Sequence, residues 1–248
     1  PRLMRYQLAD GETTVSFARP VHRLVVLHGE EVLPATALGL QAGRLTEGHR
    51  FLSSGAISIQ SAQAYEQTLT NAKVTVSFGE RRKLIDHALE AAAKAQSLAL
   101  GTAAEVEALR DEVTAIVECP AVYVGSFEER YLEVPAECLI LTMQTNQRYF
   151  PLFKTDGQLS NRFLIVSNMA IADPSRIIEG NERVIKPRLA DAEFFYAQDR
   201  KVSLASRLPR LESVVYHAKL GSQAQRMLRV KTLAGHMAAK LGLAANDV

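Results

Sequence analysis

The pattern of strand-forming residues changes abruptly near Asn168, and this change limits the folds that the chain can adopt. Before it, short runs of β-branched and aromatic residues alternate with helical patterns and turn signals. After it, residues 174–248 contain almost no strand-forming run, and apolar residues recur at helical spacing. The sequence therefore predicts an α+β domain over residues 1–170, with a mixed sheet and flanking helices, and a helical segment over residues 171–248.

The individual elements follow from periodicity and from breakers such as Pro20, which cannot donate within a strand ladder. An Asp-Gly pair at 156–157 lies between two strand-like runs and predicts a hairpin. We expect strands at 14–27, 32–40, 73–78 and 113–127, and helices at 61–71, 80–100, 134–143, 202–208 and 223–241. The last of these helices has an apolar stripe made of Leu228, Leu233, Met237 and Leu241.

Residues 180–195 interleave cationic, acidic and large apolar side chains without a simple amphipathic division. Ile185, Leu189 and Tyr196 fall at helical spacing and predict a helix with one buried face. Pro187 has no N–H to donate, so we expect a kink or a new helical start near it, with Asn181 as a plausible cap.

The charged residues of this stretch have two possible roles. Arg188 and Asp191 lie three residues apart, and such a pair is commonly a surface ion pair that contributes about 0.2–0.5 kcal/mol. Alternatively, the density of Arg183, Lys186 and Arg188 suits contact with phosphates. The sequence alone leaves both readings open.

The chain carries 29 Lys and Arg against 27 Asp and Glu, a net charge of +2, which is too small to indicate a nucleic-acid binder by itself. The excess lies late in the chain, because residues 175–248 contain 13 Lys and Arg and 7 Asp and Glu. The sequence has no Gly-x-x-x-x-Gly-Lys-Ser/Thr loop, no Gly-x-Gly-x-x-Gly, no His-Glu-x-x-His and no Gly-x-Ser-x-Gly motif. It also has no apolar run of about 20 residues, so we expect no membrane partner.

Six motifs occur in one order along the chain, and together they resemble the β subunit of bacterial tetrameric glycyl-tRNA synthetase. They are Phe-Ala-Arg-Pro-Val-His at 17–22, Gly-His-Arg-Phe at 48–51, Val-Glu-Cys-Pro at 117–120, Val-Pro-Ala-Glu at 134–137, Gln-Arg-Tyr-Phe-Pro at 147–151, and the stretch 180–195. One departure is Cys119, where the family pattern has Trp. We expect this smaller side chain to affect packing.

The resemblance implies a cytoplasmic α₂β₂ enzyme that joins glycine to its tRNA with ATP and Mg²⁺. The adenylation site would lie on the α subunit, and the β subunit would bind glycine-specific tRNA. This chain would be an internal fragment that holds no cofactor of its own. Its first domain would be similar to the editing-type domain of phenylalanyl-tRNA synthetase, and its helical segment would begin an HD-like domain.

Cationic and aromatic residues are paired repeatedly on the predicted loops and strand ends, and we expect them to include tRNA contacts, with Tyr149 or Phe51 stacking on an unpaired base. No catalytic residue and no metal ligand is predicted. Two alternatives are an editing hydrolase of mischarged tRNA and an architectural segment that assembles the subunits. The candidate tRNA-binding residues are Arg19, His22, His49, Arg50, Arg148, Tyr149, Lys186 and Arg188.

Overall fold

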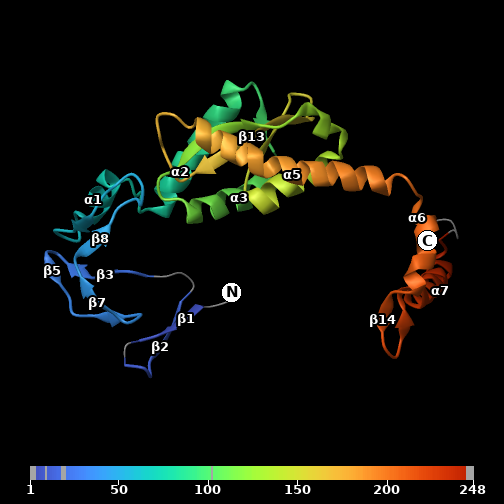
Figure 1. Cartoon of the computed structure of the whole chain (residues 1–248), viewed down its shortest axis with the longest axis horizontal. Helices are drawn as coiled ribbons and strands as arrows, with labels where there is room; N and C mark the ends of the chain where they lie inside the picture. Colours follow the sequence, from blue (N-terminus) through green and yellow to red (C-terminus); the bar gives the residue numbers. More distant parts are fainter. Residues whose placement is uncertain (1–3, 9, 18–20, 102, 244–248) are drawn as a thin grey trace. The chain divides into compact units, whose positions relative to one another are not determined.

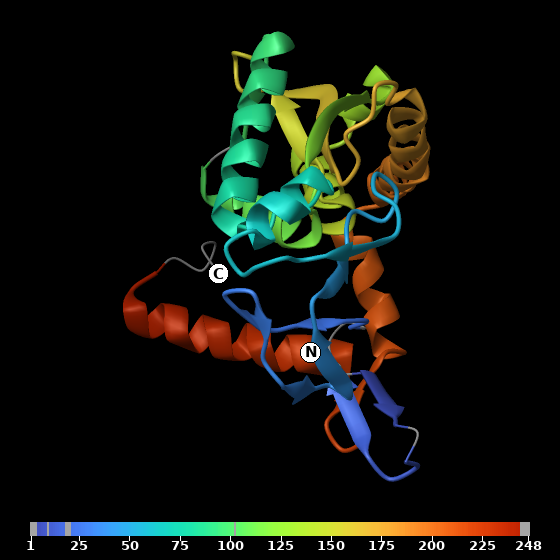
Figure 2. The ribbon, with the colours of Figure 1, turned by 90° about the vertical axis from the view of Figure 1, so that its left-hand side faces the viewer.

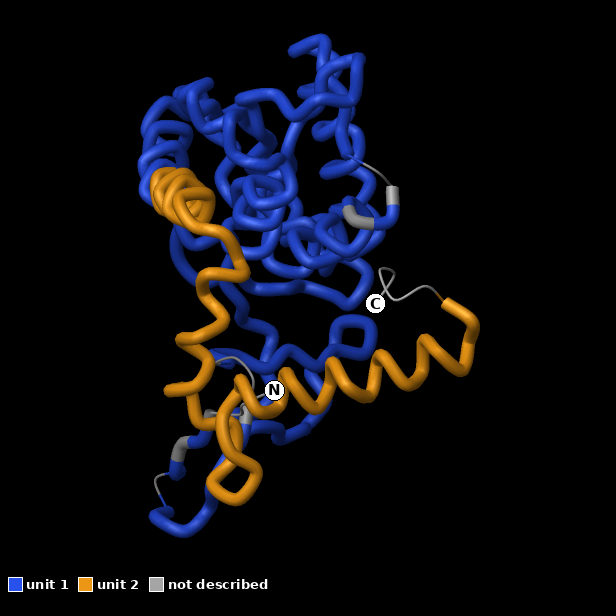
Figure 3. The backbone as a smooth tube through the Cα atoms, turned by 90° about the vertical axis from the view of Figure 1, so that its right-hand side faces the viewer, with its two compact units in different colours: residues 1–189 blue, residues 190–248 orange. Residues whose placement is uncertain are grey.

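The computed structural model describes residues 4–8, 10–17, 21–101 and 103–243. The chain forms two compact units, residues 1–189 and residues 190–248 (Figure 3). The division lies inside a single long helix, α5 (Ser175–Asp199). The domain boundary near residue 170, where the strands of unit 1 end, stays a prediction. The mixed α+β class is confirmed, since several small sheets and seven α-helices are present in the described residues.

The described residues between Met4 and Ser58 include short strands that pair in small sheets (Figure 1). All of these pairs are antiparallel except β3 with β7. A short helix, α1 (Tyr65–Asn71), follows them. The strands are β1 (Met4–Gln7), β2 (Thr14–Phe17), β3 (Leu24–Val25), β4 (Leu27–His28), β5 (Glu31–Val32), β6 (Thr36–Ala37), β7 (Leu40–Gly43), β8 (Leu45–Glu47) and β9 (Ala56–Ser58).

A four-stranded antiparallel sheet forms the centre of unit 1, with strand order β10-β12-β13-β11. The predicted hairpin is confirmed, because β12 and β13 pair around the Asp-Gly turn and Gly157 adopts a φ of +81°. These strands are β10 (Ala99–Leu100), β11 (Ala121–Ser126), β12 (Phe150–Phe153) and β13 (Leu159–Ser167).

Two helices, α2 (Phe78–Ala95) and α3 (Ala103–Ile116), contribute the apolar core on one face of this sheet. The Ser77 side chain caps α2 by accepting a hydrogen bond from the backbone N–H of Glu80. Alternate residues of the strands point to this face, so Leu152 and Leu164 join the core. The buried cluster is completed by Ile85, Leu89, Ala93, Val106, Leu109, Val113, Val117 and Phe150.

Helix α5 lies on the opposite side of the sheet from α2 (Figure 2). Its residues Ile185 and Leu189 are fully buried, as their helical spacing predicts. Between β11 and β12 the chain forms a 3₁₀ helix, η1 (Glu129–Glu133), then α4 (Ala136–Leu141), which continues into a π-helix, η2 (Thr142–Gln147).

Pro187 does not start a new helix, contrary to our expectation, because α5 runs through it from Ser175. Asn181 therefore lies inside the helix and is not its cap. Because Pro187 has no N–H, the backbone carbonyl of Arg183 loses its helical partner. Both residues are exposed, so this carbonyl can be hydrated. The buried stripe of Ile185 and Leu189 holds the helix together across this point.

The strand predicted at 73–78 was wrong, and the prediction of strands at 113–127 is confirmed only for β11 (Ala121–Ser126). Residues 74–77 are extended but unpaired as a strand; the N–H of Thr75 instead bonds to the carbonyl of Glu118. Residues 113–116 end α3, because Val113 and Val117 complete the helical stripe that packs in the core. Alternating valines fit a strand and a buried helix face equally well, so periodicity could not separate them.

Unit 2 contains a hairpin that the sequence did not predict, formed by β14 (Val215–His217) and β15 (Gly221–Ser222). Before it come α6 (Leu204–Arg207) and the 3₁₀ helix η3 (Leu208–Glu212). After it, α7 (Gln223–Leu241) has the predicted bounds. A capping box of Ser222 and Gln225 fixes the start of α7.

The apolar stripe of α7 is exposed in this structure, since Leu228, Leu233, Met237 and Leu241 are each more than half accessible. Within the described part of unit 2, Ala238 is the one buried apolar side chain. The described residues of unit 2 therefore form no cluster of buried apolar side chains. No helix in the described ranges combines the length and the apolar content that a membrane span requires.

Neighbouring residues of α5 allow a matched test of its packing. Ile185→Ala removes a fully buried side chain and is expected to lower the free energy of unfolding by about 2–5 kcal/mol. Val184→Ala, at a position that is 48% exposed, should change it by less than about 0.5 kcal/mol. Urea denaturation followed by circular dichroism measures both; equal effects would contradict the packing of α5 described here.

Candidate functional site

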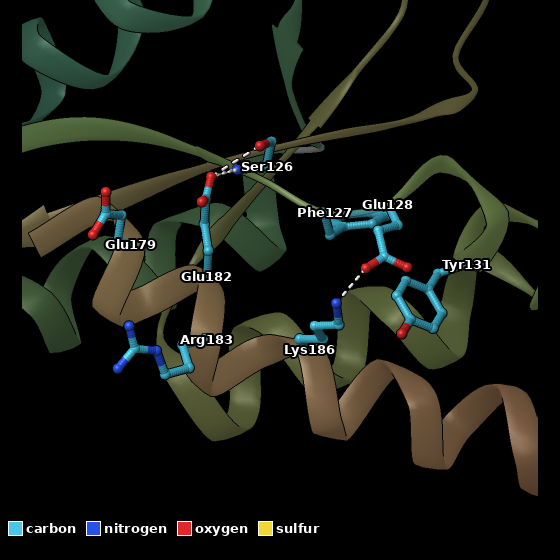
Figure 4. Close-up of a pocket in the computed structure, with 8 residues that line it drawn as sticks. All are labelled: Ser126, Phe127, Glu128, Tyr131, Glu179, Glu182, Arg183 and Lys186. Carbon is cyan, nitrogen blue, oxygen red and sulfur yellow. Dashed lines mark hydrogen bonds and ion pairs between the residues drawn. The ribbon is translucent and has the colours of Figure 1, made fainter. Parts of the chain in front are cut away.

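A cavity of about 520 Å³ lies between the end of β11 and one face of α5 (Figure 4). Its apolar part is formed by Phe127 and Tyr131, which are both buried. Its polar part combines three carboxylates with two cationic groups. The lining residues are Ser126, Phe127, Glu128, Tyr131, Glu179, Glu182, Arg183 and Lys186.

Two polar contacts cross this cavity from α5. The carboxylate of Glu182 accepts hydrogen bonds from the backbone N–H of Ser126 at 2.7 Å and from its hydroxyl at 2.9 Å. The ammonium of Lys186 contacts Glu128 at 2.5 Å. This contact lowers the pKa of the Glu128 carboxyl and raises the pKa of Lys186. Lys186, a predicted tRNA contact, therefore already has a partner within the protein.

Tyr149 is buried and holds α5 to the sheet. Its hydroxyl donates a hydrogen bond to the side-chain oxygen of Asn181 at 2.7 Å, and its ring stacks on Phe163 with 4.7 Å between centroids. Burial raises the pKa of Tyr149 to about 12. Since only 4% of the residue is accessible, it offers no ring face to a base, and we correct our expectation that it stacks on RNA.

His49 is also buried, and both of its ring nitrogens are used within the protein. Nε2 lies 2.6 Å from the carbonyl oxygen of Asn168, while Nδ1 accepts hydrogen bonds from the backbone N–H groups of Phe51 and Leu52 at 3.2 Å. These partners require the neutral tautomer with its proton on Nε2. His49 is 1% exposed, so our expectation of a phosphate contact is corrected here too.

Asn168 joins two of the sequence motifs, a role that residue spacing gave no means of predicting. Its side-chain oxygen accepts hydrogen bonds from the backbone N–H groups of Glu118 at 2.7 Å and Cys119 at 2.9 Å. Its backbone carbonyl oxygen is the partner of His49 Nε2. At Gly48 a Cβ atom would lie 2.6 Å from the Cβ of Ala72, so only glycine fits. The Gly-His-Arg-Phe loop is therefore locked to the end of the main sheet.

This locked loop presents two side chains outward. Phe51 is 69% exposed, and the guanidinium carbon of Arg50 lies 5.6 Å from the centroid of its ring. Phe51 is also tilted against His49, with 6.3 Å between ring centroids. In such an arrangement the cation can contact a phosphate, and the exposed aromatic face can stack on an unpaired base.

The remaining predicted residues are dispersed. Arg19 lies outside the described residues. His22 and Arg188 are exposed, and the ion pairs of the described residues include none between Arg188 and Asp191. Arg148 adopts a left-handed φ of 57° after the π-helix and pairs with Glu112 at 2.8 Å.

Within the described ranges, no group of three or more His, Cys, Asp or Glu side chains is placed to hold a metal ion. Both thiols, Cys119 and Cys138, are free. The carboxylates of the cavity lie beside Arg183 and Lys186. These groups can recognise a ligand by charge and hydrogen bonding.

Comparison with known proteins identifies the family. The model of the glycyl-tRNA synthetase beta subunit family matches residues 1–247. The chain belongs to this family. The glycine–tRNA ligase beta subunit of Aromatoleum aromaticum is 55% identical over 242 residues, and that of Neisseria meningitidis serogroup A is 54% identical over 243 residues. That of Methylobacillus flagellatus is 53% identical over 244 residues.

These three alignments cover 97% or 98% of the chain but 34% of each relative. The chain thus spans about a third of the length of the curated beta subunits that it matches. The family that the ordered motifs resemble is confirmed by the match.

The raised pKa of Tyr149 predicts a loss of stability at alkaline pH. Because the folded state keeps the phenol neutral, this contribution is complete below the unfolded pKa near 10 and is lost as pH rises towards about 12. Tyr149→Phe should remove part of the alkaline fall while costing about 0.5–1.5 kcal/mol near pH 7, from the lost bond to Asn181.

Urea midpoints measured between pH 8 and pH 12 test this expectation. Tyr65→Phe serves as the control, since Tyr65 lies in α1 and is half-buried. A Tyr149→Phe variant that loses stability with pH as steeply as the control would contradict the stated role of the phenol.

Proposed function

We propose that this chain is part of the tRNA-binding surface of glycine–tRNA ligase. The whole protein would join glycine to glycine-specific tRNA in the cytoplasm, with ATP and Mg²⁺ used at a partner α subunit. Family membership and the names of the relatives support this proposal. The division of labour between subunits also fits the sequence, which has no nucleotide-binding motif.

The exposed Arg50–Phe51 pair is the observation that carries the proposal. A base stacked on an aromatic side chain contributes about 1–3 kcal/mol, and sequence-specific RNA recognition commonly uses such stacking. Phe51 has the exposure that this requires, and the buried His49 fixes the loop before any ligand arrives. A preorganised loop loses less conformational entropy when it binds.

The cationic residues of α5 contribute unequally to the proposed surface. Lys186 contacts Glu128 and shares its cavity with Glu179 and Glu182, and these carboxylates repel a phosphate. Arg188 is exposed and outside that cavity. We therefore assign phosphate contact to Arg50 and Arg188, and we assign to Lys186 mainly the fixing of α5.

Two further points stay proposals about the same chain. Unit 1 would be similar to the editing-type domain of phenylalanyl-tRNA synthetase, and the segment 171–248 would begin an HD-like domain. An editing hydrolase or a purely architectural segment would explain the family membership equally well. The exposed cation–aromatic pair supports tRNA binding, which an editing hydrolase of tRNA would share and a purely architectural segment would not require.

Variants of Phe51 test the proposal in the full-length protein that carries this chain. Phe51→Ala should weaken the binding of glycine-specific tRNA by about 5- to 150-fold, which corresponds to the 1–3 kcal/mol of one stacked base. Arg50→Gln should weaken binding and flatten its dependence on salt. Fluorescence anisotropy at several salt concentrations measures both effects.

The chain contains a matched control for this pair. Phe78 is 46% exposed at the start of α2, and the guanidinium carbon of Arg81 lies 5.9 Å from its ring centroid. Phe78→Ala should leave tRNA affinity within about 2-fold of the parent protein. Binding that is unchanged in Phe51→Ala, or weakened equally in Phe78→Ala, would contradict a specific role for the Arg50–Phe51 pair.

A further inference from the structure

Helix α7 carries a row of apolar side chains along one narrow face, which we call the α7 seam. Its members occur at positions i, i+3, i+7 and i+11, so at 3.6 residues per turn they lie within about a quarter of the helix circumference. Each is between 56% and 71% exposed. One helix typically packs along another through a narrow apolar row of this kind. The seam consists of Val230, Leu233, Met237 and Leu241.

The side of α7 next to the seam is already covered within unit 2. Helix α7 contacts η3 and both strands of the hairpin (Figure 1). Ala238 is buried, and Met227 and Ala234 are half-buried, so these residues form the side that η3 and the hairpin cover. The α7 seam lies beside them and remains more than half exposed.

The charges of α7 all have one sign. Within Gln223–Leu241 there are four Lys or Arg residues and no Asp or Glu. Arg229, His236 and Lys240 recur at positions i, i+7 and i+11, so they form a row along one edge of the seam. A partner that packs on the seam is therefore stabilised by carboxylates along this edge.

A cavity of about 400 Å³ adjoins the seam on the same cationic edge. Leu233 belongs to both, so the apolar surface of the seam continues into the cavity. Side chains of one packed helix fill the grooves of the other, and the cavity can take such a side chain. Its lining residues are Leu228, Arg229, Thr232, Leu233 and His236.

The relatives indicate where a partner helix can come from. The alignments cover 34% of each beta subunit, so about 66% of each of those polypeptides lies outside the matched part. We propose that, in the full-length protein, the α7 seam binds an amphipathic helix from the remaining part of the same polypeptide. The apolar face of that helix covers Met237 and Leu241, and its carboxylates face Arg229 and Lys240.

The seam differs from the cationic helices that bind RNA or membranes. Single-stranded RNA is bound by cations together with aromatic rings that stack on bases, whereas α7 contains no Phe, Tyr or Trp. A helix in a membrane interface typically carries Trp or Phe on its apolar face, which the seam also lacks. The proposal rests on the seam and does not depend on tRNA binding.

Photocrosslinking of the full-length protein tests the proposal. The photoreactive residue p-benzoylphenylalanine replaces Met237 in one variant and, in the control, Ala239, which is exposed on the opposite side of α7. Denaturing electrophoresis and mass spectrometry of the peptides identify the products. We expect a crosslink within one polypeptide, from position 237 to a peptide outside residues 1–248 that carries Asp or Glu at helical spacing. Position 239 should give none of it above background.

Hydrogen exchange measured by mass spectrometry gives a second readout. Leu233→Lys combined with Met237→Lys should speed the exchange of the α7 amides by at least about 10-fold, and Ala239→Lys by less than about 2-fold. Unchanged exchange in α2 shows that unit 1 stays folded in each variant.

Equal exchange of α7 in the two variants would overturn the proposal. The crosslinking is repeated with tRNA and with anionic lipid vesicles added. A product from position 237 with tRNA, lipid, a second copy or another subunit, or none outside residues 1–248, would overturn it as well. Because the expected crosslink forms without tRNA, failure here is distinct from failure of the proposed function.

Discussion

The docking of α5 against the main sheet is the interaction on which the candidate site depends, because α5 and the end of β11 line it together. Ile185 and Leu189 are fully buried, and each side chain of this size contributes about 1.5–3 kcal/mol when it is removed from water. Polar contacts from Tyr149 to Asn181 and from Ser126 to Glu182 then fix the position of the helix. The cavity lies beside these contacts, and both Ser126 and Glu182 line it.

Several residues of the sequence motifs stabilise the fold and are not free to bind a ligand. His49 and Tyr149 look like ligand-binding residues in the sequence. Both are buried, and their polar atoms form hydrogen bonds within the protein. Unpaired buried polar groups are costly, so these satisfied contacts specify one conformation of the loops around them. The groups that remain available are those on the outside of the locked loop, Arg50 and Phe51.

Helical periodicity predicted α7, the buried stripe of α5 and most of α2, because these depend on spacing along one element. The helix predicted at 80–100 ends at Ala95, and Ala99–Leu100 form β10. It could not predict that Asn168 bonds to Glu118, Cys119 and His49, since this cluster joins residues far apart in the chain. It also could not separate exposed from buried aromatics, because accessibility is set by tertiary packing. Strand predictions failed where alternating apolar residues entered a helix or an unpaired segment.

We propose that the exposed Arg50–Phe51 loop contacts tRNA while the buried motif residues support it. Photocrosslinking of glycine-specific tRNA containing 4-thiouridine to the full-length protein, followed by mass spectrometry of the peptides, tests this most directly. Crosslinks within residues 48–53, with none on Tyr149, are the predicted result. Crosslinks on Tyr149, or none in residues 48–53 while other parts of the protein crosslink, would contradict the account.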